Sequence, residues 1–247
     1  MNLLSTIGPA ANVVVVGATG GIGLSLCCHL AAHDEVDRVF ALSRKGVGLS
    51  GEKFERIHFD LLDEASIAAA AEQVAAEVQP DLVIVATGVL HRDSVQPEKS
   101  LREIESDSML TNFQVNTIGP TLVAKHFLPI MPCNRKSVFA VLSARVGSIS
   151  DNRLGGWLSY RSSKAALNMS MATLAIEHRR RCPEGIVVSL HPGTVDTLLS
   201  KPFTSRVPLG QLFGVDRAAR QLLEVIDRLH PQDSGGFFAW DGSPITY

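Results

Sequence analysis

A run of four valines that leads into a glycine-rich turn constrains the fold of this chain more than any other feature. Valine is β-branched, so the valines at positions 13–16 predict a strand that is buried on both faces. Residues 24–32 then favour a helix. A glycine-rich turn between a strand and a helix lets the backbone approach a phosphate, and a pyrophosphate can rest on the helix N-terminus. We therefore expect a dinucleotide site here, with a tight turn that binds no ligand as the alternative. The expected contact residues are Gly17, Thr19, Gly20, Gly21, Ile22 and Gly23.

Apolar runs of strand length alternate with amphipathic helical segments along the whole chain. Strands are expected at residues 13–16, 38–42, 55–59, 81–86, 136–142, 185–190 and 236–240. Helices are expected at residues 21–32, 64–78, 107–130, 159–181 and 216–230. Such alternation argues for a parallel sheet with right-handed crossovers. The sequence therefore predicts an α/β fold, a single-domain Rossmann fold over residues 1–247 with a doubly wound parallel sheet of about seven strands and helices on both faces.

Composition excludes several classes of partner. The 247 residues are 45% hydrophobic, which is enough for the core of one domain. Net charge is −2 and the longest basic run, residues 179–181, ends a helix, so no nucleic-acid partner is expected. Apolar stretches are no longer than a strand, so no membrane partner is expected. Residues 1–12 lack the charged start and apolar core of a signal peptide, which favours a cytoplasmic location.

The cysteines give no sign of metal binding. They stand at positions 27, 28, 133 and 182, and this spacing matches no metal-ligand pattern. In a cytoplasmic protein we expect all four to be reduced residues that contribute to packing. The eight histidines lend no support to a metal site either, so no bound metal is expected.

Tyr160 and Lys164 stand four residues apart in Tyr-Arg-Ser-Ser-Lys, within a segment that is expected to be helical. Residues at this spacing lie one above the other on one helix face. A cation near a phenol favours the phenolate and lowers its pKa from about 10, which suits a group that exchanges a proton near neutral pH. Such pairs also occur by chance on surface helices. The presence of the glycine-rich turn far upstream makes a catalytic interpretation of this pair more convincing.

Taken together, these motifs resemble the short-chain dehydrogenase/reductase family over nearly the whole chain. Gly17, Gly21 and Gly23 match the three glycines of the family's cofactor turn. Asp60 corresponds to an acid that lies near the adenine in the family, and Ala86-Thr87-Gly88 stands where the family has Asn-Ala-Gly. The other matching positions are Asn116, Tyr160, Lys164 and the Pro192-Gly193 loop. Residues 147–152, 155–157 and 238–242 are similar to the C-factor and sniffer-type carbonyl reductase branch.

The resemblance implies a reaction and a role for each residue. The implied activity is reversible hydride transfer between a nicotinamide and a small-molecule carbonyl or alcohol. Lys164 would bind the nicotinamide ribose and lower the pKa of Tyr160, which would donate the proton to the carbonyl oxygen. Asn116 would hold a water chain between Lys164 and solvent. The remaining implied cofactor contacts are Leu61, Ala86, Thr87, Gly88, Pro192, Gly193 and Val195.

The catalytic serine is the point at which this chain departs from the family pattern. The family has Ser-Ser-x-x-Gly after the fifth strand, and its second serine contacts the substrate. Here Ala144 takes that second position, between Ser143 and Arg145. Ser143 is the favoured candidate because it closes the strand, although adjacent strand residues point to opposite faces. Ser148 is the alternative, since Gly147 permits a turn that could return its hydroxyl towards Tyr160.

The end of the second expected strand indicates which cofactor is used. An acid at this place would bind the ribose hydroxyls of NAD, whereas an arginine accommodates the phosphate of NADP. Ser43 is neutral, and Arg44 with Lys45 can pair with a phosphate. We therefore expect NADP, with NAD as the alternative.

Three further expectations concern mobility, assembly and a competing function. Residues 194–210 contain two prolines and are interpreted as a mobile substrate lid or an ordinary surface loop. The family resemblance allows a homodimer or a homotetramer, although some carbonyl reductases are monomers. A nucleotide-binding signalling or sensor protein, as the C-factor name implies, is the alternative to an enzyme, but intact Tyr160, Lys164 and Asn116 favour the enzyme. A sugar-nucleotide epimerase would need a longer C-terminal substrate region.

Overall fold

The computed structural model describes residues 4–46, 48–91, 95–206, 208 and 210–247, and its centre is one seven-stranded sheet. The strand order is β3-β2-β1-β4-β5-β6-β9, and every neighbouring pair is parallel. The strands are β1 Ala11–Val16, β2 Val36–Ser43, β3 Phe54–His58, β4 Leu82–Val85, β5 Ser137–Leu142, β6 Gly185–His191 and β9 Phe237–Ala239. All seven expected strands and the expected Rossmann fold are confirmed.

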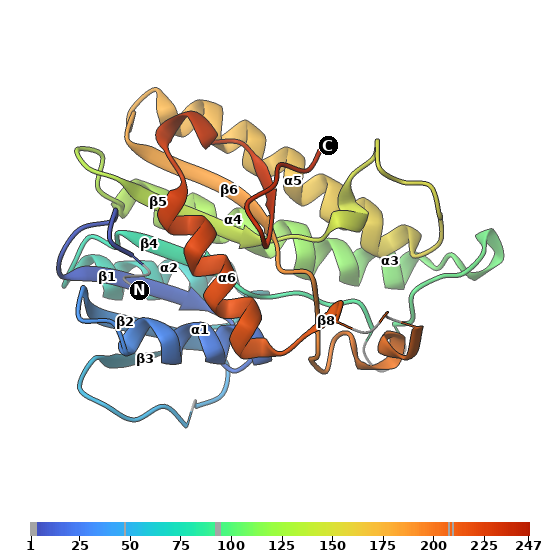
Figure 1. The fold of residues 1–247 in the computed structure, drawn as a ribbon, viewed down its shortest axis with the longest axis horizontal. Coiled ribbons are helices and arrows are strands. Elements are labelled where there is room, and N and C mark those ends of the chain that lie inside the picture. The colour runs from blue at the N-terminus through green and yellow to red at the C-terminus, as the bar shows by residue number, and fades with distance from the viewer. Residues whose placement is uncertain (1–3, 47, 92–94, 207, 209) are drawn as a thin grey trace.

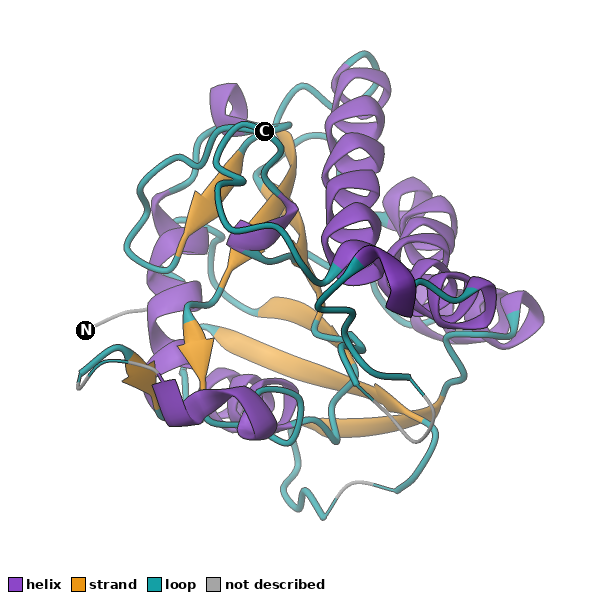
Figure 2. Cartoon of the chain, turned by 90° about the vertical axis from the view of Figure 1, so that its right-hand side faces the viewer, coloured by secondary structure: helices purple, strands orange, loops and turns teal. Residues whose placement is uncertain are grey.

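Helices cover both faces of the sheet (Figure 1, Figure 2). One face packs against α1 and α6, and the other packs against α2, α4 and α5. The helices are α1 Gly21–Ala31, α2 Glu64–Ala75, α3 Ser106–Phe113, α4 Gly119–Phe127, α5 Leu158–Arg179 and α6 Val215–Arg228. None of the helices among the described residues is both long and apolar enough to cross a bilayer.

The valine run forms the middle of the sheet. Val13 and Val15 face the layer of α1 and α6, whereas Val14 and Val16 face the opposite layer. All four side chains are 0% exposed. Full burial of one valine side chain stabilises the fold by about 1.5–3 kcal/mol, so β1 is well suited to lie at the centre of the sheet.

The strand order places the crevice of the fold beside β1. The chain runs outward from β1 to β2 and β3, and then continues on the other side of β1 with β4. In open parallel sheets, ligands bind at such a switch point, outside the carboxyl ends of the strands. Gly17 follows β1 and Ala86 follows β4 at this edge, while Ser143 and Pro192 follow β5 and β6. The sheet therefore brings the separate sequence motifs to one edge.

The single helix expected at residues 107–130 is wrong in detail, because the structure divides it into four parts. α3 is followed by the π-helical η2 (Gln114–Ile118), then α4 and the 3₁₀ turn η3 (Leu128–Ile130). Pro120 has no N–H to donate to the carbonyl of Asn116, so a continuous α-helical ladder cannot form here. π-Helical turns are frequent at functional sites, and this one carries Asn116.

The segment expected to be a lid contains regular structure. β7 (Thr194–Val195) pairs in parallel with β8 (Leu212–Phe213), and the 3₁₀ turn η5 (Lys201–Arg206) lies between them. Residues 207 and 209 of this segment lie outside the described residues. Whether the segment moves during function stays a prediction.

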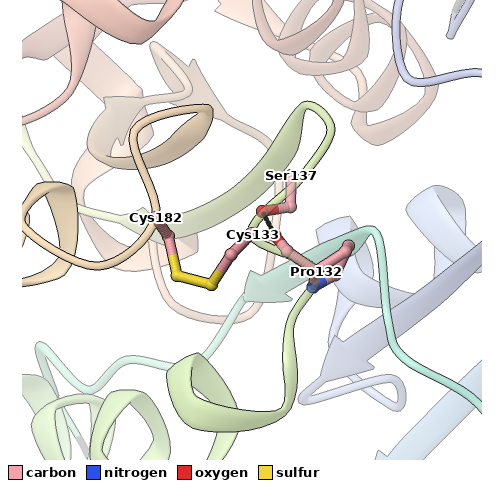
Figure 3. Close-up of a disulfide and its surroundings, with 4 residues drawn as sticks. All are labelled: Pro132, Cys133, Ser137 and Cys182. Atoms are coloured by element: carbon pink, nitrogen blue, oxygen red, sulfur yellow. Dashed lines mark hydrogen bonds between the residues drawn. A yellow bond between two sulfur atoms is a disulfide. The ribbon is translucent and has the colours of Figure 1, made fainter.

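The expectation of four reduced cysteines is wrong for one pair, since Cys133 and Cys182 form a disulfide (Figure 3). The sheet explains the pairing. Ser137 of β5 lies opposite Gly185 of β6, so the segments just before these strands are neighbours. A disulfide stabilises a protein by about 2–4 kcal/mol, mainly by restricting the unfolded chain. Cys27 is buried and free, and Cys28 is exposed and free.

Candidate active site

The first turns of α5 carry the tyrosine and lysine that the sequence pairs. Tyr160 is 8% exposed and Lys164 is 2% exposed. Lys164 Nζ lies 5.9 Å from the centroid of the Tyr160 ring. It also donates a 2.8 Å hydrogen bond to the carbonyl oxygen of Leu142 at the end of β5. The lysine thus links α5 to the carboxyl edge of the sheet.

The expected electrostatic effect of Lys164 on Tyr160 is wrong in this structure. Burial raises the pKa of Tyr160 above its usual value of 10.0 instead of lowering it. Burial also lowers the pKa of Lys164 from 10.5 to about 7, because the interior disfavours an ammonium ion. Near neutral pH the lysine is therefore only partly charged, and the phenol keeps its proton.

Asn116 joins three parts of the site. Its side chain is 0% exposed, and its Oδ1 accepts a 2.8 Å hydrogen bond from the N–H of Val89. Its Nδ2 donates to the carbonyl oxygen of Val89 at 2.8 Å and to Ser163 Oγ at 3.1 Å. The amide therefore ties the segment after β4 to α5, one residue before Lys164.

The separate motifs converge near Gly88. A Cβ atom placed on Gly88 would lie 3.5 Å from Asn116 Oδ1 and 3.7 Å from Lys164 Nζ. It would also lie 3.7 Å from Leu199 Cδ1, which belongs to the expected lid. Absence of a side chain at Gly88 keeps this point open beside the lysine and the asparagine.

Neither candidate serine is shown to contact Tyr160. The Ser143 hydroxyl donates a 2.7 Å hydrogen bond to Asn168 Oδ1 on α5, and the Ser143 side chain is buried. The Ser148 hydroxyl accepts a 3.2 Å bond from the N–H of Asp151 and is buried as well. Ser143 therefore directs its single proton at α5, whereas Ser148 uses its oxygen as an acceptor.

The glycine-rich turn has the shape of a phosphate cradle. Gly17 has a positive φ of 88°, and a Cβ atom there would lie 2.9 Å from Thr87 Cγ2. A Cβ atom on Gly23 would lie 2.2 Å from the carbonyl oxygen of Gly17, so helix and turn pack too closely for any side chain. Gly20 precedes α1 with no side-chain cap, and the first turn of α1 contains no acid. This helix N-terminus therefore suits an anion.

The expected adenosine end of the site lies beyond β2 and β3. Arg44 and Lys45 are exposed, while Ser43 is buried and its Oγ donates a 2.6 Å hydrogen bond to the carbonyl oxygen of Lys45. Asp60 is half-buried, and its Oδ1 accepts from the N–H of Leu62. Leu61 is buried, and a Cβ atom on Gly119 of α4 would collide with it.

The expected nicotinamide end contains a polar atom with no partner. The Thr87 Oγ1 atom is buried without a hydrogen-bond partner in the described part of the chain. Ala86 precedes it, and both follow β4 at the switch point. A group with a hydroxyl or amide at this place would satisfy the orphaned oxygen. Together with the uncapped N-terminus of α1, this atom makes the crevice fit a dinucleotide.

The Pro192-Gly193 loop is held by an aromatic pair. Gly193 has a φ of 81°, and a Cβ atom there would lie 2.6 Å from the Phe213 ring. The Phe213 ring packs edge-on against Trp240 with centroids 4.8 Å apart. Val195 of β7 is 4% exposed. These contacts fix the backbone that leaves β6 at the crevice.

Three residues outside the predicted catalytic and cofactor-binding sets also lie in this region. Thr197 lies against the first turn of α1, since a Cβ atom on Gly21 would be 3.1 Å from Thr197 Cγ2. Leu199 reaches the space near Lys164, as described above. Glu98 is a buried acid that contacts the start of α5. In the sequence, Thr197 belongs to the motif around Pro192-Gly193, and Leu199 is a candidate for an apolar pocket or for lid packing. Sequence reasoning missed Glu98, because its spacing gives no signal.

The histidines form no metal site in the structure. His29 of α1 and His33, just beyond the end of this helix, are four residues apart, a spacing that also occurs in metal sites. His29 Nε2 instead lies 2.8 Å from Asp216 Oδ1 of α6. Across the residues that are described, no group of three or more His, Cys, Asp or Glu side chains is placed to hold a metal ion.

Known proteins share this combination of fold and motifs. Residues 11–207 match the short chain dehydrogenase family. The chain belongs to this family. It is 31% identical to the 1-hydroxy-2-glutathionyl-2-methyl-3-butene dehydrogenase of Rhodococcus sp. (strain AD45), over 96% of this chain and 100% of that protein. It is therefore a member of a family of oxidoreductases that use a nicotinamide cofactor.

Two further similarities confirm the resemblance to the C-factor and carbonyl reductase branch. The C-signal protein of Myxococcus xanthus is 34% identical over 60% of this chain and 84% of its own length. The crystal structure of NADPH-bound carbonyl reductase from chicken fatty liver matches with a TM-score of 0.82 and 28% identity, over 97% of this chain and 100% of that chain.

The depressed pKa of Lys164 predicts a pH-dependent cost to stability. Between pH 7 and 10.5 the unfolded lysine is protonated while the folded lysine is increasingly neutral, so the native protein gains stability as pH rises. A Lys164→Met variant loses this contribution. Its free energy of unfolding relative to the native protein should fall with rising pH in this window, by up to about 1.4 kcal/mol per pH unit.

Urea unfolding at several pH values measures this difference. The matched control is Lys125→Met, because Lys125 lies on the surface of α4. The free energy of unfolding of Lys125→Met relative to the native protein should stay constant across the same window. A difference for Lys164→Met that does not change between pH 7 and 10 would contradict the depressed pKa.

Proposed function

We propose that this protein is an NADP(H)-dependent reductase that transfers hydride reversibly between a nicotinamide and a small carbonyl or alcohol. The observation that carries the proposal is the convergence of Asn116, Tyr160 and Lys164 at the carboxyl edge of the sheet, next to the turn at Gly17. The NADPH-bound carbonyl reductase with the same fold supports the choice of reaction.

The proposed mechanism assigns the proton to Tyr160. When bound, the reduced nicotinamide supplies the hydride. Tyr160 donates its phenolic proton to the carbonyl oxygen as that oxygen becomes an alkoxide, and it takes the proton back in the reverse direction. Lys164 would hold the nicotinamide ribose. Asn116 bonds the backbone of Val89 and the hydroxyl of Ser163, the residue before Lys164. It would also support the water chain that returns the proton.

We propose Ser143 as the second hydrogen-bond donor to the substrate oxygen, because it closes β5 at the crevice. Donation requires that its hydroxyl turn away from Asn168, which it contacts in this structure. Ser148 remains the alternative. Its proton is not committed to the backbone, since its oxygen accepts from the N–H of Asp151.

The proposed substrate space is lined by apolar and aromatic side chains. Trp157 packs edge-on against Tyr160 with ring centroids 6.5 Å apart. Phe203 of η5 approaches Trp157 at 5.0 Å, and Leu199 reaches towards Lys164. Such walls suit a carbonyl that bears an apolar group. The segment at residues 194–210 would close over it as the proposed lid.

We propose NADP as the cofactor and NAD as the alternative. The exposed guanidinium of Arg44 and the ammonium of Lys45 follow β2, where the ribose phosphate of NADP would lie. Asp60 and Leu61 would contact the adenine. Thr87, with its orphaned hydroxyl, would contact the nicotinamide half.

A signalling or sensor role is the second candidate function, and the C-signal relative favours it. A sensor would need the nucleotide fold but not the proton donor. Tyr160, Lys164 and Asn116 are all present and buried, which supports turnover. The enzyme is therefore the preferred function.

The proposal includes one domain, a cytoplasmic location and a homo-oligomer. Intracellular NADPH supports that location, although the Cys133–Cys182 disulfide argues against it because such bonds are rare in the cytosol.

Exposed Ile118 and Met169 lie on the elements that carry Asn116 and Tyr160. Apolar side chains on these surfaces suit contact with a second copy of the chain.

Replacement of Tyr160 by phenylalanine tests the mechanism. The ring is kept and the proton is lost, so kcat for carbonyl reduction should fall by about 10²-fold or more, while NADPH binding should be retained. Turnover is followed by NADPH oxidation with a panel of aldehydes, ketones and quinones. Unchanged turnover in the variant would refute the role of Tyr160, and a native protein with no turnover on the panel would favour the sensor.

Alanine substitutions test the choice of serine. Ser143→Ala should lower kcat by about 10²-fold, the scale of losing one oxyanion donor, and Ser148→Ala should have a milder effect. The opposite ranking would assign the role to Ser148. If neither substitution changes kcat, Tyr160 is the sole protein donor to the substrate oxygen.

Removal of the Arg44 side chain tests the cofactor. The native protein should bind NADPH more tightly than NADH. Arg44→Ala should reduce this difference in binding free energy by about 1.5–3 kcal/mol, the contribution of one charge-assisted hydrogen bond. Titration of both nucleotides measures the change. Arg38→Ala is the matched control, because Arg38 lies near the opposite end of β2 and contacts Glu77. Equal affinity of the native protein for both nucleotides would overturn the assignment.

A further inference from the structure

A buried acid from another part of the chain contacts the residue next to Tyr160. Glu98 belongs to the segment between β4 and α3, and it is 3% exposed. Its carboxylate oxygens accept hydrogen bonds from the N–H of Ser159 at 3.2 and 3.3 Å, and one of them also accepts from Ser159 Oγ. Ser159 is 1% exposed and directly precedes Tyr160.

This acid supplies the N-terminal cap that α5 lacks. Trp157 is the N-cap residue of α5 and offers no capping side chain, and the first turn of the helix contains no acid. The exposed N–H groups of a helix start carry partial positive charge and are stabilised by an anion. Glu98 provides that anion across space, so the position of its segment is coupled to the position of the first turn of α5.

The backbone of Glu98 holds the residues just before the helix. Its carbonyl oxygen accepts a hydrogen bond from the N–H of Trp157. Gly155, Gly156 and Trp157 have φ values of 63°, 67° and 54°, three successive residues in the left-handed region. A bulky residue rarely adopts this conformation unless its surroundings enforce it. Glu98 is thus part of what keeps Trp157 in place.

The position of Trp157 matters because of what its ring touches. Its ring lies edge-on to Tyr160 and 5.0 Å from Phe203. Phe203 in turn lies 5.7 Å from His91, whose Nε2 is 2.9 Å from the carbonyl oxygen of Leu198. The same turn therefore joins the catalytic helix to the segment that carries Leu198 and Phe203.

We propose, on the basis of the proposed carbonyl chemistry, that Glu98 is a positioning residue for Tyr160. By holding both Ser159 and Trp157, it sets the place of the Tyr160 ring relative to Trp157 and Phe203. Its hydrogen bonds in the described part of the chain go to Ser159 and Trp157 and none goes to the glycine-rich turn. It would therefore control the rate of the proton-transfer step and not the affinity for the cofactor.

The test uses tryptophan emission and steady-state kinetics together. The chain has two tryptophans, Trp157 and Trp240, so a Trp240→Phe background leaves Trp157 as the only reporter. Within this background, Glu98→Ala should shift the Trp157 emission to longer wavelength and lower kcat by about 10²-fold, the scale of a displacement of about 1 Å. The KM for NADPH should stay within about 2-fold.

Two other variants keep the test decisive. Glu98→Gln retains an acceptor oxygen for Ser159, so it should recover part of kcat and part of the native emission, and it serves if Glu98→Ala does not fold. The matched control is Glu103→Gln, because Glu103 is an exposed acid of the same segment that bonds only Lys99 and Ser100 among the described residues. It should leave kcat and emission unchanged.

The outcomes separate this proposal from the proposed function. Native emission in Glu98→Ala would refute the positioning role even if turnover fell. A loss of kcat matched by an equal change in the KM for NADPH, or by an equal loss in Glu103→Gln, would also refute it. If the native protein reduces no carbonyl, the proposed function fails, but the emission of Trp157 still decides whether Glu98 holds this turn.

Discussion

The buried amide of Asn116 is the interaction on which the geometry of the site most depends. It pairs with both backbone groups of Val89 and with Ser163 Oγ. One side chain therefore fixes the segment after β4 and the helix with Tyr160 and Lys164. Each of these buried groups would cost about 1–3 kcal/mol if left without a partner. The π-helical turn that presents Asn116 follows from the proline four residues later.

Local patterns explain why much of the fold could be predicted from the sequence. Four valines can be buried on both faces only in the middle of a sheet, and β1 lies there. Gly17 and Gly23 occupy positions where a Cβ atom would collide with the backbone or a neighbouring side chain. The Tyr160–Lys164 spacing depends only on helix geometry. These signals span at most a few residues, so they survive without knowledge of the tertiary fold.

Several features that could not be predicted depend on contacts between distant segments. Cys133 and Cys182 meet because β5 and β6 are neighbours, which their spacing does not reveal. Glu98 reaches α5 across a similar distance in sequence. The sequence shows the lysine four residues after Tyr160, but it does not show the burial that raises the pKa of Tyr160. The hydrogen-bond partners of Ser143 and Ser148 could not be predicted either, because they depend on the direction of each side chain.

Burial of the tyrosine and lysine sets the protonation states from which the proposed reaction starts. The apolar surroundings raise the pKa of Tyr160 and lower the pKa of Lys164 to about 7. Both shifts favour the neutral forms, so near pH 7 the phenol is protonated and the nearby ammonium is partly discharged. Carbonyl reduction needs a protonated phenol, whereas alcohol oxidation needs a phenolate that a full positive charge would stabilise. The raised pKa therefore keeps Tyr160 in the protonated state from which the proposed carbonyl reduction starts, although it also makes the phenol a weaker acid.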